Sequence, residues 1–596
     1  MCGISGYIGI SKERREIVER MRDEMRHRGP DDQGLWSDEQ VVLGHNRLSI
    51  LDLSPNGHQP MVRNDWVIIF NGEIYNFEEL REELQASHGR PFVTGTDTEV
   101  ILAAWEVWGR ACLQRFRGMW AFCLYNRKTH ELVLSRDRFG IKPLYYFQDR
   151  SKFIFASEIK ALFKDPSVPR KACLSVVSDY LLVGFHDHRQ ETFFEGIRQL
   201  PPGSSLFMDT QTGGFSLEHY YDLSERVRNR RGSVAEFGDA FASSVKLHLR
   251  SDVPVGTCLS GGLDSSSVAS LASTYVRRQG EVFRAVTGQS GDPANDETEY
   301  ARLVVERAAL EWHVTKPTTE DYREHWERCL WHQDEPSGGP SVFMQYWVMK
   351  ASHEAGLKVM LDGQGGDECL LGYERYYPTL FLHWLKKGHL GTFAHEFFAA
   401  ARHSKLSLSQ LVLYSFYFLT PKLREARLRK RVPWLPPSLT RESFERLECS
   451  MRDSRDPLTL QLSEIGCFQL PHLLKYEDRN SMAWSVESRV PFVDHEVIEA
   501  ALSLAPEDKI RNGYTKWALR KVMNGKMPDA VTWRREKVGF EAPKGGWSEG
   551  NRNWMSDVIQ TSSLLKELGV TDAPDDGPCF QALFNLAHWQ KIFRVN

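Results

Sequence analysis

The chain has 596 residues, with 75 Lys or Arg against 79 Asp or Glu, so its formal net charge is −4. Hydrophobic residues make up 41% and charged residues 26%, an ordinary globular composition that excludes a disordered or fibrous chain. A prior of about 150 residues per domain predicts more than one domain. Because basic residues are not in excess, the charge gives no support for nucleic-acid binding driven by bulk positive charge.

The ten cysteines form no CxxC pair and no Cys/His cluster with zinc spacing. The first residues show no basic segment followed by a long apolar one, so we expect no signal peptide. The uncharged run 406–421 contains Ser, Gln, Thr and Pro, whereas a membrane span needs about 20 mainly apolar residues. We therefore expect a cytoplasmic protein with reduced thiols and no membrane segment.

The first 200 residues predict short strands, tight turns and a few helices. An apolar run at 67–70, then Asn71-Gly72, then residues 73–75, indicates a hairpin whose turn is the Asn-Gly pair. Further strands are expected at 132–135 and 144–147.

Two helices are expected in this part of the chain. The first starts at Asn76, with Glu79 as the partner in a capping box. The second starts at Thr96 or Asp97, with Glu99 completing the box, and ends before Gly109.

The pattern changes after the charged stretch 222–232, which lacks apolar periodicity and is interpreted as a linker. Beyond it, predicted strands at 253–259 and 358–361 alternate with helices at 265–278, capped near Gly280, and 341–355. This alternation predicts a parallel sheet covered on both faces. Residues 374–460 predict a helical insertion, and its basic run at 422–431 is interpreted as a solvated helix face rather than a nucleic-acid or membrane site.

Cys2 is a candidate nucleophile because of its position. Removal of the initiator methionine would give Cys2 a free α-amino group. An α-amine has a pKa near 8, so it can take or relay the proton of its own thiol at neutral pH.

Five motifs follow in order over the first 100 residues: CGISGYIG, RHRGPDDQG, GHNRLSILD, FNGEIYN and GTDTEV. Together they resemble the glutaminase domain of class II, N-terminal-nucleophile amidotransferases. The resemblance implies an αββα sandwich that hydrolyses glutamine, with Cys2 as nucleophile and an oxyanion hole at Asn71 and Gly72. It implies that Arg47 grips the substrate carboxylate and that Glu73 and Asp97 lie near the substrate amine. The implied glutamine-binding residues are Arg47, Leu48, Ser49, Ile50, Leu51, Asn71, Gly72, Glu73 and Asp97.

The segment 260–266, SGGLDSS, lies between a predicted strand and a predicted helix. Its glycines let the backbone approach a phosphate, the helix N-terminus offers N–H groups, and Ser260, Ser265 and Ser266 add hydroxyl donors. The GK[ST] of a Walker loop is missing, so γ-phosphate transfer by that route is not expected. The segment resembles the pyrophosphate loop of the ATP-pyrophosphatase family, which implies cleavage of ATP between its α and β phosphates and a Mg²⁺ contact at Asp264.

A glutaminase paired with this loop resembles the glutamine-hydrolysing asparagine synthetase family, and DEPSGGPS, LDGQGGDECLLGY, KYEDRNSMAWSVESRVPFVD, YTKWALR and WRREKVGF match in order. The resemblance implies Mg²⁺ contacts at Asp264 and Asp367. It also implies that Lys516 and Lys537 neutralise phosphate and the adenylation transition state, while Arg489 holds the fold together. The implied ATP-binding residues are Leu259, Ser260, Gly261, Gly262, Asp264, Ser265, Val286, Asp362, Gly363 and Lys516.

The expected organisation is a glutaminase domain at 1–215, a linker at 216–234 and an ATP-binding domain at 235–596. The expected fold is an αββα sandwich followed by a doubly wound parallel-sheet α/β domain with helical additions. The expected ligands are glutamine, ATP with Mg²⁺, and aspartate or another carboxylate. Ammonia would travel through the interior between the sites. Neither nucleic acid nor membrane is expected as a partner, and the resemblance implies a homodimer.

Gln364 departs from the family pattern, in which many members carry Glu. Glutamine cannot take a proton at neutral pH, so either Gln364 only positions groups or another residue acts as base. Glu477 is the candidate, because related β-lactam-forming synthetases have a Glu near this position. The departure leaves the acceptor open between aspartate and a carboxylate of another biosynthetic intermediate.

Two further alternatives concern the function as a whole. The first alternative is that the N-terminal domain is a catalytically idle module that serves assembly or sensing, which Cys2 and its companion motifs oppose. A retained Met1 would bear on this choice, because it blocks the α-amine of Cys2. Modification of tRNA through the same phosphate loop lacks the paired cysteines and the basic surface expected for it.

Overall fold

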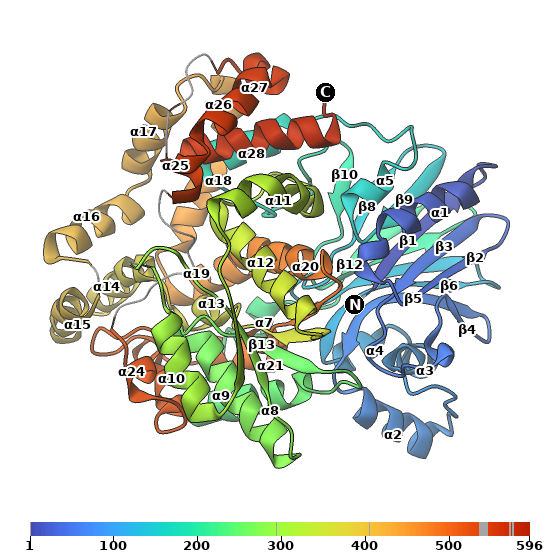
Figure 1. The fold of residues 1–596 in the computed structure, drawn as a ribbon, viewed down its shortest axis with the longest axis horizontal. Helices are drawn as coiled ribbons and strands as arrows, with labels where there is room; N and C mark the ends of the chain where they lie inside the picture. The colour runs from blue at the N-terminus through green and yellow to red at the C-terminus, as the bar shows by residue number, and fades with distance from the viewer. Residues whose placement is uncertain (1, 294, 405, 536–545, 571–573, 575–576) are drawn as a thin grey trace.

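The computed structural model describes residues 2–293, 295–404, 406–535, 546–570, 574 and 577–596. Figure 1 shows the N-terminal strands, blue to cyan, on one side and the later helices on the other. In these ranges, no helix has the length and apolar character needed to cross a membrane. All ten cysteines are free thiols.

Two six-stranded antiparallel sheets build the N-terminal part. The first has the spatial order β10 (Ile197–Gln199), β8 (Tyr145–Gln148), β9 (Lys152–Ala156), β1 (Gly3–Gly9), β3 (Val41–Arg47), β2 (Asp32–Ser37). The second has the order β12 (Phe215–His219), β11 (Ser204–Asp209), β7 (Glu131–Arg136), β6 (Gly118–Asn126), β5 (Trp66–Ile74), β4 (Met61–Arg63).

Successive side chains of a strand point to opposite faces of its sheet, so each sheet has one face toward the other sheet and one face toward helices. Val67 and Ile69 of β5 are buried between the two sheets, while Ile68 and Phe70 pack against the outer helices. The outer helices are α1 (Arg14–Glu24) on the first sheet and α2 (Phe77–His88) and α3 (Asp97–Trp108) on the second. The layers are therefore helix, sheet, sheet, helix, which confirms the predicted αββα sandwich.

The predicted hairpin turn at Asn71-Gly72 is wrong. Strand β5 runs straight through both residues, and the register opposes Asn71 to Ala121 and Gly72 to Trp120 of β6. A Cβ on Gly72 would lie 2.1 Å from the Met119 carbonyl oxygen. The glycine is needed because the neighbouring strand approaches closely, not because the chain turns.

Both helices begin where predicted, but neither forms the complete capping box that was predicted. Thr96 caps α3 by accepting the Glu99 N–H, while the Glu99 carboxylate accepts instead from Thr94 and Arg63. Asn76 makes no cap bond in α2 and accepts the Arg117 N–H at 2.8 Å. The stretch predicted as a linker contains the short helix α7 (Leu223–Val227), capped by Asp222. The domain limits stay predictions.

Five parallel strands form the second part, confirming the predicted parallel sheet. Their order is β15 (Glu311–Thr315), β14 (Arg284–Gly288), β13 (Val255–Cys258), β16 (Val359–Leu361), β17 (Glu487–Arg489). The chain moves outward from β13 to β15 and then returns to β16 on the other side of β13. Such a reversal opens a crevice at the carboxyl ends of the strands, where ligands bind in this class of sheet.

Helices cover both faces of this sheet. Ala285, Val359 and Leu361 pack with α8 (Val234–His248) and α9 (Leu263–Arg278) on one face. Val286 and Met360 pack with α12 (Pro340–Glu354) on the other. The flanking helices are α10 (Thr298–Ala308), α11 (Thr319–Gln333), α13 (Gly366–Leu370), α20 (Leu470–Met482), α21 (His495–Leu502), α22 (Pro506–Lys509), α23 (Trp517–Met523) and α24 (Asp529–Thr532).

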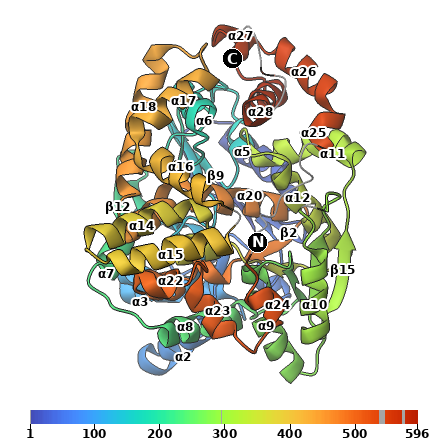
Figure 2. The same ribbon diagram turned by 90° about the vertical axis from the view of Figure 1, so that its left-hand side faces the viewer.

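The predicted insertion at 374–460 is helical, and Figure 2 shows it facing the viewer. Its helices are α14 (Tyr377–Lys386), α15 (Leu390–His403), α16 (Leu408–Leu419), α17 (Pro421–Arg431), α18 (Pro437–Asp453) and α19 (Pro457–Ser463). The remaining helices are α4 (Cys112–Arg115), α5 (Ile159–Leu162), α6 (Leu174–Val183), α25 (Gly546–Gly550), α26 (Arg552–Thr561), α27 (Ser563–Glu567) and α28 (Gly577–Phe593).

Candidate active sites

Cys2 is buried at the start of β1, beside Asn71 of the second sheet. Its backbone N–H donates to Asn71 Oδ1 at 3.0 Å, and its carbonyl accepts from Arg28 Nε at 3.0 Å. Burial raises the pKa of the Cys2 thiol, and the facing Leu48 N–H offsets only part of that rise. A thiol in this setting needs a proton acceptor next to it. The predicted loss of Met1 concerns a residue outside the described ranges.

Arg47, at the end of β3, is buried and held by backbone carbonyls. Its Nη1 donates to the Ser54 carbonyl at 2.9 Å and its Nη2 to that of Leu51 at 3.3 Å. Leu48 and Ile50 lie in the core beneath the loop, and the Ser49 N–H donates to Asp31 at 2.8 Å. The loop therefore orients the guanidinium, a geometry suited to a carboxylate ligand.

Glu73 and Asp97 lie together on the buried side of the same region. Burial and the charge of Glu487 raise the pKa of Asp97 to about 7, although its carboxylate accepts the Ile74 N–H. Burial, Glu487 and Asp97 raise the pKa of Glu73 well above the usual range. Burial and mutual repulsion favour the neutral form of these two carboxyl groups. A cation bound between them would favour the charged carboxylates, so the pair suits an ammonium group.

Arg489 and Glu487 of β17 reach this region from the other half of the chain. Arg489 Nη2 lies 3.5 Å from Glu73 Oε1, and Arg489 Nε donates to Glu487 Oε1 at 2.6 Å. Arg489 Nη1 also donates to the His248 carbonyl at 2.8 Å. Arg489 therefore joins the halves, in line with its expected structural role. Glu487 was missed, because no local pattern shows that a residue so distant in sequence faces Glu73.

A second buried charge cluster ties the two halves together. The Arg28 guanidinium makes two bonds to Asp478, at 2.9 and 3.0 Å, and one to Glu158 at 2.9 Å. Arg479 pairs with Glu158 at 3.1 Å and with Asp334 at 2.9 Å. Since Arg28 also holds the Cys2 carbonyl, this cluster connects the nucleophile to α20.

A pocket of about 310 Å³ opens at the carboxyl ends of β13, β14 and β16, where the sheet topology predicts a ligand. The predicted Gly261 does not line this pocket. It has φ +88°, and a Cβ there would lie 2.6 Å from the Glu297 carbonyl oxygen, so the position requires glycine. Lys537 lies outside the described residues. The other predicted ATP and metal residues line the pocket: Leu259, Ser260, Gly262, Asp264, Ser265, Val286, Asp362, Gly363, Asp367 and Lys516.

Lys516 stands between two carboxylates of this pocket. It pairs with Asp264 and with Asp367, the latter at 2.6 Å. A Cβ on Gly372 would lie 1.9 Å from Asp367 Oδ1, and one on Gly366 would lie 2.7 Å from Asp264 Cγ. Two carboxylates, a lysine and the α9 N-terminus form a donor set that suits Mg²⁺ and phosphate oxygens.

Gln364 and Glu477 meet at the α20 wall of this pocket. Gln364 Nε2 donates to the Tyr476 hydroxyl at 3.4 Å. Glu477, the next residue of α20, is buried and accepts from Gln345 and Ser488. Burial and the neighbouring Asp362 raise the pKa of Glu477 well above the usual range. A carboxyl group with a raised pKa therefore lies close to Gln364.

Comparison with known proteins matches both halves of the chain. A family model described as a glutamine amidotransferase domain matches residues 1–221, and one described as asparagine synthase matches residues 236–584. "Asparagine synthetase [glutamine-hydrolyzing] 1" of Bacillus subtilis (strain 168) is 32% identical over 94% of this chain and 90% of its own length. A "Putative asparagine synthetase [glutamine-hydrolyzing]" of Mycobacterium tuberculosis (strain H37Rv) is 31% identical over 92% of this chain and 88% of its own length. "Amidase chry2" of Gibberella zeae is 26% identical over 100% of this chain and 97% of its own length.

Proposed function

Because the chain belongs to the asparagine synthase family and carries a glutamine amidotransferase domain, we propose that it makes an amide from glutamine, ATP and a carboxylic acid. The observation that carries the proposal is the pairing of two sites in one molecule. Cys2 lies beside Asn71 and Arg47, and the Asp264–Lys516–Asp367 group lies at the switch point of the parallel sheet.

The first reaction takes place at Cys2. The thiol sulfur attacks the side-chain amide carbon of glutamine, its proton passes to the leaving nitrogen, and ammonia departs from a γ-glutamyl thioester. Water then hydrolyses the thioester to glutamate. Asn71 and the Gly72 N–H stabilise the developing oxyanion, Arg47 holds the substrate carboxylate, and Glu73 and Asp97 face its ammonium group.

The second reaction takes place in the nucleotide pocket. An oxygen of the acceptor carboxylate attacks the α-phosphorus of ATP, the bond to the β-phosphate oxygen breaks, and pyrophosphate leaves. Ammonia then attacks the acyl carbon, loses a proton and displaces AMP. Bound Mg²⁺ would neutralise charge on the phosphates; Asp264 and Asp367 would hold it, while Lys516 faces the same oxygens.

Aspartate is the first acceptor proposed, with asparagine as the product. A different carboxylic acid is the alternative, and Gln364 at the pocket wall supports keeping it. In either case Glu477 is the group proposed to take the proton from ammonia, supported by its burial behind Gln345. Ammonia is proposed to cross the buried interface that the Arg28–Asp478 and Arg489–Glu73 contacts span.

The test compares the wild type with Cys2→Ala and with Cys449→Ala, a matched change at an exposed cysteine. Acceptor-dependent AMP and amide formation are measured with glutamine and with ammonium chloride. Cys2→Ala should lose glutamine-supported synthesis and keep ammonia-supported synthesis, and Cys449→Ala should keep both. Loss of both activities in Cys2→Ala, with the fold intact by circular dichroism, would refute the two-site proposal.

A further inference from the structure

A second cavity, of about 800 Å³, lies next to the nucleotide pocket. Its walls come from α6, the loop that leads into α12, the end of α17, and α25 and α28. Helix α6 contacts both α17 and α28, and Figure 2 shows the three together. We call this space the α6–α28 cavity. None of the residues placed in the two reactions above lines it.

The α6–α28 cavity and the nucleotide pocket meet at Ser341, which lines both. This residue lies in the first turn of α12, a helix of 15 residues. Helix N-termini attract carboxylates and other anions. The junction is therefore suited to an acid that reaches from one space into the other.

A row of rings separates the two spaces and ends at Gln364. His186, which lines the α6–α28 cavity, stacks on His472 with centroids 4.0 Å apart. His472 and Tyr476 form a T-shaped pair with centroids 5.4 Å apart, and the Tyr476 hydroxyl accepts from Gln364 Nε2 at 3.4 Å. Gln364 lines only the nucleotide pocket, and this row of rings connects it to the larger cavity.

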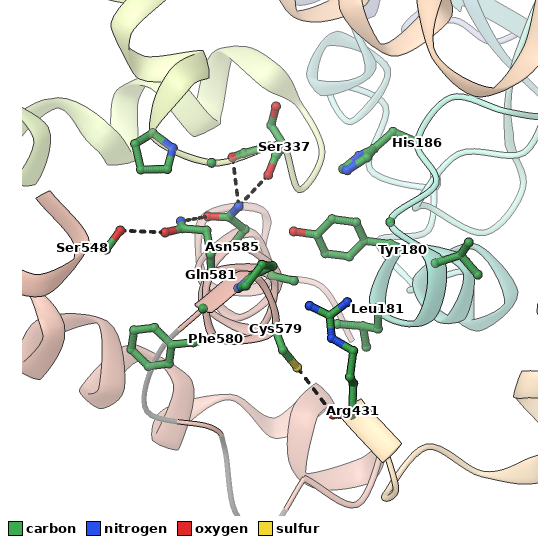
Figure 3. Close-up of a pocket in the computed structure, with 18 of the residues that line it drawn as sticks. Tyr180, Leu181, His186, Ser337, Arg431, Ser548, Cys579, Phe580, Gln581 and Asn585 are labelled. Atoms are coloured by element: carbon green, nitrogen blue, oxygen red, sulfur yellow. Dashed lines mark hydrogen bonds between the residues drawn. The ribbon is translucent and has the colours of Figure 1, made fainter. Parts of the chain in front are cut away.

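The lining of the α6–α28 cavity combines ring faces with hydrogen-bonding groups. Figure 3 shows Tyr180 and His186 on one side and Gln581 and Asn585 on the other. Ser337 borders the cavity and is 3% exposed, and its Oγ is buried without a hydrogen-bond partner in the described structure. Asn585 Nδ2 donates to the Ser337 carbonyl, which positions this loop.

The size and chemistry of the cavity together indicate a ligand class. Its volume is within the range of about 300–1,000 Å³ typical of sites for drug-sized molecules, and aspartate alone needs no second space of this kind. Ring faces suit an apolar ring surface, and amides and hydroxyls suit several hydroxyl groups. Arg431 and Arg552 add positive charge at the exposed rim, which Glu549 offsets in part.

We propose that the α6–α28 cavity binds the body of the acceptor, a sugar acid of the uronic-acid class, whose carboxylate passes Ser341 into the nucleotide pocket. This inference rests on the proposed amide-forming function and takes, of its two acceptors, the alternative to aspartate, whose class it names. The sugar hydroxyls would bond to the half-buried Gln581 and Ser548, and the ring would lie against Tyr180. The carboxylate would reach the pocket beside Gln364.

The experiment measures glutamine-dependent AMP formation with D-glucuronate, D-galacturonate, L-aspartate and the dipeptide glycyl-aspartate as acceptors. Ala582→Phe fills the α6–α28 cavity from α28, and Ala235→Phe makes the same change at an exposed position of α8. The wild type should use a sugar acid with a kcat/KM at least about tenfold above that for aspartate. Ala582→Phe should raise the KM for the sugar acid by about tenfold or more, with the KM for ATP and the glutaminase rate unchanged, and Ala235→Phe should change none of these.

Each other result counts against the inference in a distinct way. If aspartate is the best acceptor and Ala582→Phe leaves its kinetics unchanged, the acceptor subsite is refuted while the ligase proposal stands. If only the dipeptide supports AMP formation, the cavity is assigned to a peptide and the sugar-acid class is wrong. If no acid supports AMP formation with glutamine or with ammonia, the proposed function itself fails.

Discussion

The Arg28–Asp478 pair allows a quantitative test of how the two halves are joined. Arg28 is fully buried and Asp478 is 3% exposed, and two hydrogen bonds of 2.9 and 3.0 Å connect them. Removing one partner of a buried pair leaves an uncompensated charge, which costs about 3–5 kcal/mol. In Arg28→Met, Asp478 would lose both hydrogen bonds and keep Lys142 at 3.8 Å and the charge of Arg479, so we expect a loss at the lower end of this range.

Asp478→Asn should cost less, about 1.5–3 kcal/mol, because it removes a charge-assisted bond without stranding a carboxylate, and Arg28 keeps Glu158. The double variant should therefore be more stable than the two single losses added together, with a coupling of about 0.5–3 kcal/mol. Arg15→Met is the control, since Arg15 pairs with Glu19 at the surface, where such a bond is worth about 0–1 kcal/mol.

Urea unfolding of the four proteins and the control, followed by fluorescence and by circular dichroism, provides the free energies where the two probes coincide. Because Arg28 also holds the Cys2 carbonyl, Arg28→Met should lower glutamine-supported synthesis more than ammonia-supported synthesis. A loss below about 1 kcal/mol for Arg28→Met, or strict additivity in the double variant, would show that the pair does not couple the two halves.

Three further predictions concern the two sites. The raised pKa of Asp97, about 7, means that this group is neutral at lower pH, so the KM for glutamine should rise as pH falls through about 7. In Asp97→Asn that pH dependence should be absent, and an unchanged slope would contradict the assignment. Lys516→Met should slow pyrophosphate release by about 10²–10³-fold with glutaminase activity intact; a loss under about tenfold would exclude a transition-state role. Glu477→Gln should lower ammonia-supported amide formation by about 10²-fold while acceptor-dependent pyrophosphate release continues, and equal loss of both steps would point to a structural role instead.

Much of the local secondary structure could be predicted from the sequence. The strand, glycine-rich turn and helix around Asp264 were predictable, because periodicity and turn residues act over a few positions. The αββα layers and the parallel sheet followed from motif resemblance and strand–helix alternation, and both are confirmed. The same local reasoning failed at Asn71-Gly72, where the close approach of β6 overrides the turn preference of the pair.

Contacts between distant segments were decided only by the tertiary structure. The bonds from Arg28 to Asp478 and from Arg489 toward Glu73 join residues hundreds of positions apart, and no period or motif encodes such a pairing. The α6–α28 cavity is likewise assembled from helices that are separated in the chain. Residue type therefore predicted candidate reactive groups, whereas packing decided which charges are buried together and which space lies next to the nucleotide pocket.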